Sequence, residues 1–190
     1  QTAFFSLPLS LDSIFKIIFL IEVTVGAFKR ALNSNTTMST GPPSMELKSV
    51  MGFAGDVRGG LLVHPNQRHI IYPLGSTIVV KDLMDDSLQF LQGHNNEVSC
   101  IALSPDGSRL VSGQKTHMGF KADIIVWNFD ERAVMHKLVL HVGLVQDLAF
   151  SPDGTYIASL GGPDDNKLAI WEAESGIPVR GEPAGTNTAL

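Results

Sequence analysis

The chain has 190 residues, of which 44% are hydrophobic and 17% charged, a composition that fits a folded globular protein and excludes a largely disordered one. Its formal net charge of -5 provides no basic surface for phosphate groups, so nucleic acid is not an expected partner. The single cysteine, Cys100, excludes an intrachain disulfide and favours a reducing compartment, and we expect it to be a buried structural thiol.

Residues 1–44 differ in pattern from the rest of the chain. Their longest apolar stretch is interrupted by Asp12, Lys16 and Glu22, and an acidic residue at the centre of a membrane span costs about 2.5–3.5 kcal/mol, so we do not expect a span. Because "MSTGPPSMELKSV" suits a start at Met38, we expect residues 1–37 to be upstream sequence translated in error; a weak signal or membrane anchor is the alternative. We therefore assign residues 1–44 to a non-conforming leader and residues 45–190 to the folded part.

The folded part contains twelve short apolar runs of strand length and no helical period. Pro-Asp-Gly at 105–107 and at 152–154 supplies tight turns between runs. This pattern predicts an all-β fold of three four-stranded antiparallel units. The runs are 59–65, 69–75, 76–83 and 87–93 in the first unit, 97–104, 109–113, 123–129 and 134–140 in the second, and 144–151, 156–162, 167–173 and 177–182 in the third.

The second and third units repeat one pattern. Each runs from a histidine through an alternating apolar run to Ser-Pro-Asp-Gly, and then to a second apolar run. The spacing from His94 to His141 equals the spacing from Ser104 to Ser151, 47 residues in both cases. A fixed period of this length is typical of repeat architectures such as propellers and solenoids.

These repeats resemble WD40 repeats, whose blades open near Gly-His and close near Trp-Asp. Gly93-His94 precedes Trp127-Asn128 in the second unit, and Leu140-His141 precedes Trp171-Glu172 in the third. The first unit lacks Gly-His and carries Lys81-Asp82 in place of Trp-Asp. The resemblance implies a WD40 β-propeller, of which this chain holds about three blades of a partial ring, because typical rings have about 4–8 blades.

The WD40 resemblance implies a buried polar cluster in each blade, built from a histidine, a serine, an aspartate and a tryptophan. Such a cluster would be structural, since each buried polar group left without a partner costs about 1–3 kcal/mol. In the second unit a longer loop moves the aspartate towards the tryptophan, which disturbs the usual spacing. The expected members are His94, Ser112, Asp123 and Trp127 in the second unit, and His141, Ser159, Asp165 and Trp171 in the third.

The longer loop of the second unit, residues 114–123, carries a second resemblance. Together with "IIYPLGSTIVV" and "SLGGPDDNKLAIWE", its segment "MGFKADI" resembles the amino-terminal blades of a WD40 family of the ciliary axoneme. The loop mixes cations with apolar side chains that an ordinary polar insertion would lack, so we expect a partner-binding surface there. Its expected contact residues are Lys115, His117, Met118, Phe120 and Lys121.

No residue pattern predicts catalysis. The six histidines are not paired as metal ligands, Asp164 and Asp165 follow Gly-Gly-Pro as turn residues, and the lysine after Gly113 lacks phosphate-loop spacing. We therefore expect no enzyme activity, no cofactor, no metal and no small-molecule substrate.

The axonemal resemblance implies a microtubule inner protein that stabilises ciliary and flagellar doublets for motility, with tubulin and other axonemal inner proteins as partners. It implies a cytoplasmic protein of the cilium or flagellum axoneme, not a membrane protein. The alternative is a general cytosolic WD40 adaptor for signalling or ubiquitin-transfer complexes.

Overall fold

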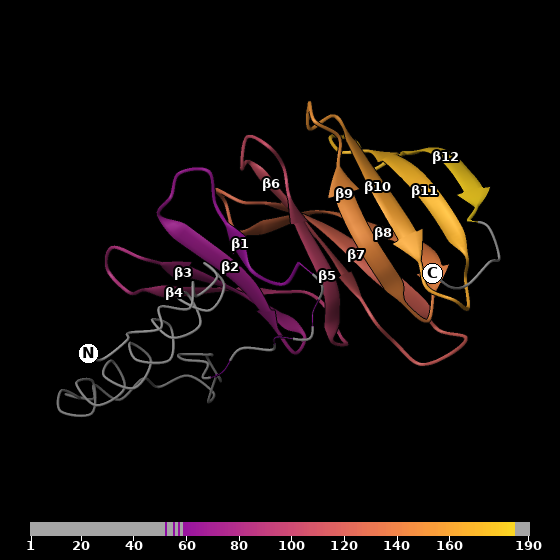
Figure 1. The fold of residues 1–190 in the computed structure, drawn as a ribbon, viewed down its shortest axis with the longest axis horizontal. Coiled ribbons are helices and arrows are strands. Elements are labelled where there is room, and N and C mark those ends of the chain that lie inside the picture. Colours follow the sequence, from indigo (N-terminus) through magenta and orange to yellow (C-terminus); the bar gives the residue numbers. More distant parts are fainter. Residues whose placement is uncertain (1–51, 53–54, 56, 58, 185–190) are drawn as a thin grey trace, which may run out of the picture. The chain divides into compact units, whose positions relative to one another are not determined.

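The computed structural model describes residues 52, 55, 57 and 59–184, which form three four-stranded antiparallel sheets (Figure 1). The expected leader at residues 1–44 lies outside the described residues. The described part contains no helix, and so none long and apolar enough to cross a membrane. The prediction of three four-stranded β-units is confirmed, and the sheets are not closed into a ring.

The strands follow chain order within each sheet. We call the three sheets the first, second and third blade. The first blade has β1 (Leu62–Val63), β2 (His69–Leu74), β3 (Thr77–Asp82) and β4 (Leu88–Gln92). The second has β5 (Val98–Leu103), β6 (Arg109–Gln114), β7 (Lys121–Asn128) and β8 (Ala133–Val142). The third has β9 (Val145–Phe150), β10 (Tyr156–Gly161), β11 (Lys167–Glu172) and β12 (Pro178–Pro183).

Strand β7 of the second blade is buried on both faces, which explains its unbroken apolar run. Side chains alternate along a strand, so neighbouring residues face opposite sides of the sheet. Ile124 and Val126 belong to the apolar core shared with the third blade, whereas Ile125 and Trp127 belong to the core shared with the first. A strand covered on both faces favours β-branched residues at every position instead of an apolar and polar alternation.

The blades also meet through hydrogen bonds near the start of β5. The backbone N–H of Val98 donates to the carbonyl of Gly75 at 2.8 Å, and the Ser99 hydroxyl donates to the carbonyl of Val145 at 2.6 Å. Cys100 is buried beside Val145, and burial raises the pKa of its thiol to about 12. The thiol is therefore protonated at neutral pH and unreactive as a nucleophile.

The two Ser-Pro-Asp-Gly turns have the same construction. Gly107 and Gly154 take φ values of 81° and 73°, which a side chain disfavours. In each turn the serine hydroxyl donates to the aspartate two residues later, at 2.6 Å for Asp106 and 2.5 Å for Asp153. Hydroxyl donors lower the pKa of both carboxyls to about 2, so both turns keep an ionised acceptor across the neutral and mildly acidic range.

Candidate functional site

The third blade contains the four-residue polar cluster that its sequence predicts. The Trp171 indole N–H donates to the Ser159 hydroxyl oxygen at 2.8 Å, and His141 Nε2 lies 2.8 Å from the same oxygen. His141 Nδ1 lies 2.5 Å from a carboxylate oxygen of Asp165, whose other oxygen accepts from Lys167. Burial alone would raise the pKa of Asp165, but the hydrogen bonds from His141 and Lys167 outweigh it and lower that pKa.

This cluster joins two blades. His141 lies near the end of β8 in the second blade, while Ser159 and Trp171 lie on β10 and β11 of the third. The side chains of His141 and Asp165 are 0% and 1% exposed, so neither is open to a dissolved substrate. Gly161 has to lack a side chain, because a Cβ there would lie 2.7 Å from His141 Nδ1. The arrangement holds the blades together, and its groups already occupy one another's hydrogen-bonding positions.

The second blade has a similar cluster with a different fourth member. Trp127 Nε1 donates to the Ser112 hydroxyl at 2.8 Å, and His94 Nε2 lies 2.7 Å from that oxygen. His94 Nδ1 bonds the side-chain oxygen of Gln114 at 2.9 Å. Gly93 packs against the indole, since a Cβ there would lie 3.0 Å from the ring, which explains the glycine before the histidine.

Asp123 differs from its expected place in that cluster. It lies inside β7 and accepts from Lys137 at 2.7 Å, whereas Asp165 lies in the turn before β11. The longer loop reaches β7 two residues before Asp123, so this carboxylate sits on the strand and not in the turn. Gln114 replaces the aspartate as the partner of His94 Nδ1. The sequence could have indicated this, because Gln114 lies two positions after Ser112 and so lies on the same face of β6.

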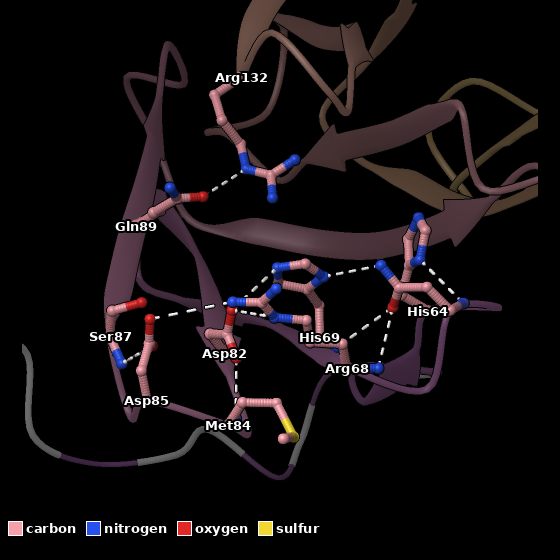
Figure 2. A network of polar contacts seen from close by, with 10 residues as sticks. His64, Arg68, His69, Asp82, Met84, Asp85, Ser87, Gln89 and Arg132 are labelled. Atoms are coloured by element: carbon pink, nitrogen blue, oxygen red, sulfur yellow. Dashed lines mark hydrogen bonds and ion pairs between the residues drawn. The ribbon is translucent and has the colours of Figure 1, made fainter.

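The first blade contacts the second through a network that the sequence analysis missed (Figure 2). Asp82 accepts from Arg68 Nε at 2.6 Å and lies 3.5 Å from His69. Burial first, and then the nearby Arg132 guanidinium, lower the pKa of His69, so its ring is neutral at pH 7. Arg132 in turn donates to Gln89 of β4 at 2.6 Å, which links the two blades.

Phe129 forms the centre of the same contact. The His64 ring stacks on it with centroids 4.2 Å apart, and the Arg132 guanidinium lies 3.9 Å above it. His64 Nε2 also bonds the carbonyl of Gly107 at 3.0 Å. His64 and His69, two of the six histidines, therefore have structural partners. Within residues 59–184, no group of three or more His, Cys, Asp or Glu is arranged to hold a metal ion.

The 114–123 loop is fixed along its backbone. Thr116 N–H donates to the carbonyl of Gly143 at 2.6 Å, and Gly143 N–H donates back to the carbonyl of Phe120 at 2.9 Å. Lys121 Nζ reaches the carbonyl of Leu140 at 3.3 Å, and Lys115 forms an ion pair with Glu97. The end of β8 and the connection from β8 to β9 therefore hold the loop from one side.

Two apolar side chains project from this fixed loop. Met118 is 80% exposed and Phe120 is 66% exposed, with Gly119 between them at a φ of 86°. His117 and Lys121 are also exposed. Large apolar side chains that stay in water on an ordered backbone are typical of a contact surface, because binding there orders little additional chain.

Comparison with known proteins supports the repeat assignment. The family model described as "WD domain, G-beta repeat" matches residues 85–128 and 133–172. These segments end at the strands that carry Trp127 and Trp171, as the repeat pattern predicts.

The chain is also similar to several curated proteins. It is 52% identical over 142 residues to cilia- and flagella-associated protein 52 of Chlamydomonas reinhardtii, which covers 74% of this chain and 23% of that protein. It is 47% identical over 140 residues to the Homo sapiens protein of the same name, with 74% and 23% covered. WD repeat-containing protein 90 of Mus musculus is 32% identical over 132 residues, 69% of this chain and 7% of that protein. The chain spans about a quarter of the length of the first two relatives, and the predicted resemblance to an axonemal WD40 family is confirmed.

Proposed function

Because this chain is a WD40-repeat protein, we propose that it is a non-enzymatic scaffold of ciliary and flagellar axonemes. The relatives that match about three quarters of it carry the name cilia- and flagella-associated protein 52. We further propose that it acts as a microtubule inner protein, bound within doublet microtubules, where it stabilises the axoneme for motility. Its partners would be tubulin and neighbouring inner proteins.

The fixed 114–123 loop is the observation that carries this proposal. A scaffold needs a rigid body with a contact surface whose shape is set before binding. Three blades provide the body, and Met118 and Phe120 provide apolar anchors on a backbone that Gly143 holds in place. Lys115 and Lys121 beside them suit an acidic protein surface such as that of tubulin.

The two buried clusters support the non-enzymatic part of the proposal. A histidine, a serine and an aspartate within hydrogen-bonding distance resemble a hydrolytic arrangement, but here Ser159 already bonds Trp171 and His141. The hydroxyl of Ser159 and the ring of His141 are both fully buried. A nucleophile has to reach its substrate, so these residues are better explained as blade contacts.

The direct test is the location of the tagged protein in ciliated cells. We expect a signal along the axoneme that survives detergent removal of the membrane, because protein contacts inside the doublet do not depend on lipid. The tag alone, expressed at the same level, is the control. A signal spread through the cytosol, or confined to nucleus or membrane, would contradict the proposal and favour the general cytosolic adaptor.

A further inference from the structure

A second exposed apolar patch lies in the turn between β3 and β4, and we name residues 83–86 the acidic tip. Met84 is 80% exposed and Leu83 is 43% exposed. They precede Asp85 and Asp86, whose side chains are 58% and 66% exposed. Lys81 pairs with Asp86 at 3.0 Å and Arg68 lies 3.9 Å from Asp85, so with Asp82 this region holds three carboxylates against two cations and keeps a net negative charge. The 114–123 loop combines its apolar anchors with Lys115 and Lys121 against the single carboxylate of Glu97, a net positive charge.

Hydrogen bonds from backbone N–H groups also hold the acidic tip. Met84 N–H donates to Asp82 at 2.8 Å, and Leu83 N–H donates to the carbonyl of Arg68 at 2.8 Å. Figure 2 shows Met84 tied to Asp82 through its backbone while its side chain extends away from the network. Hydrogen bonds from Ser87 lower the pKa of Asp85, so this carboxylate is ionised at neutral pH.

The two patches lie at opposite ends of the strands. Thr77 begins β3 beside Gly75, and Gly75 bonds Val98, which pairs with Gln114 at the base of the 114–123 loop. The loop therefore shares the end of the blades where β3 begins. The acidic tip follows Asp82, the last residue of β3, and so lies at the other end.

We infer that copies of this chain associate head to tail, with the 114–123 loop of one copy against the acidic tip of the next. Met118 and Phe120 would contact Leu83 and Met84, and Lys121 would face Asp85. Charge complementarity favours this pairing, because the net negative charge at the tip attracts the net positive charge at the loop, whereas two loops or two tips would repel each other. The inference concerns association between copies and needs no tubulin, and at any one loop the tip of another copy and tubulin would compete for Met118 and Phe120.

The expected contact is heterologous and small. When the loop of one copy binds the tip of the next, one loop and one tip remain free at the two ends. Association therefore builds an open row and not a closed dimer. Two loops of this size bury less than the roughly 1,200 Å² typical of stable complexes. The association is therefore expected to be weak and reversible, and a covalent trap is the suitable assay.

Cysteine cross-linking tests the pairing directly. One full-length chain carries Met84→Cys with a mass tag and another carries Met118→Cys without it; both positions are 80% exposed, so both variants should fold. Buried Cys100 does not compete, because its thiol pKa is about 12. With a short bis-maleimide we expect the mixed 84–118 product to exceed the statistical mixture of products. Statistical yields, or 84–84 and 118–118 products as the main ones, would overturn the inference.

Charge reversal supplies the matched control. Adding Asp85→Lys to the Met84→Cys chain should lower the mixed product about two- to five-fold, the range expected for one exposed ion pair. Adding Lys121→Glu to the other chain should then restore it. Failure of the double reversal to restore the yield would overturn the assignment of these two charges. The assay contains no tubulin, so its outcome is separate from that of the axonemal test.

Discussion

Replacing Trp127 with alanine is expected to lower the free energy of unfolding by about 3–5 kcal/mol, the usual cost of removing a buried tryptophan. Trp127 is 1% exposed, belongs to the core between the first and second blades, and donates its indole N–H to Ser112. Its removal leaves a cavity at the blade contact and a serine without its donor. Because small proteins have only about 5–15 kcal/mol of stability in total, the variant should unfold at much lower urea concentration.

Two control variants separate the causes of this loss. Trp127→Phe keeps an aromatic ring but lacks the indole N–H, so we expect a smaller loss that reports mainly the hydrogen bond to Ser112. Ile177→Ala changes a side chain that is 60% exposed and should alter stability by less than about 0.5 kcal/mol. A Trp127→Ala loss no larger than the Ile177→Ala loss would show that the first two blades do not share a packed core.

Replacing Asp165 with alanine is expected to lower the free energy of unfolding by about 3 kcal/mol, near the upper limit for a buried group left without a partner. The side chain of Asp165 is 1% exposed and faces His141 Nδ1, which has no other acceptor among the contacts of the described residues. The lowered pKa of Asp165 means that the loss should be present at neutral pH and shrink as acid protonates the carboxylate in the wild type. Thermal or urea unfolding at pH 7 measures it.

Asp123→Ala is the matched control for this second prediction. Asp123 pairs with Lys137, whose side chain is 49% exposed, and it lies outside the His94 cluster. An ion pair with one partner in water contributes about 1 kcal/mol or less, so the loss should be clearly smaller. Equal losses for Asp123→Ala and Asp165→Ala would contradict the difference between the two clusters.

The strands were predictable from sequence because the burial of a strand is reflected in the order of apolar residues along that same strand. The run "DIIVWNF" lies where β7 forms, since a strand covered on both faces has to be apolar on both. The run "KLAIWEA" lies where β11 forms, with Ala169 and Trp171 buried and Leu168 exposed. The cluster of the third blade followed from the family resemblance, because His141, Ser159, Asp165 and Trp171 keep the expected order along the chain.

The remaining features depend on contacts between residues far apart in the chain. His64 stacks on Phe129, and Arg132 bonds Gln89, pairings that no local spacing encodes. The exchange of Asp123 for Gln114 depends on the residue at which β7 begins, which loop length alone does not fix. The 114–123 loop is held by backbone hydrogen bonds to Gly143. Every residue has the same backbone groups, so the order of side chains does not predict these bonds.

Recovery of tubulin from ciliated-cell lysate tests the central claim, that the fixed loop carries binding while the buried clusters carry stability. Tagged wild-type chain is compared with a Met118→Asp, Phe120→Asp double variant and with Ile177→Asp, an exposed apolar control. We expect the double variant to melt at the wild-type temperature but to lose most of the tubulin and axonemal proteins, while Ile177→Asp retains them. Full retention by the double variant, with wild-type stability, would contradict the account.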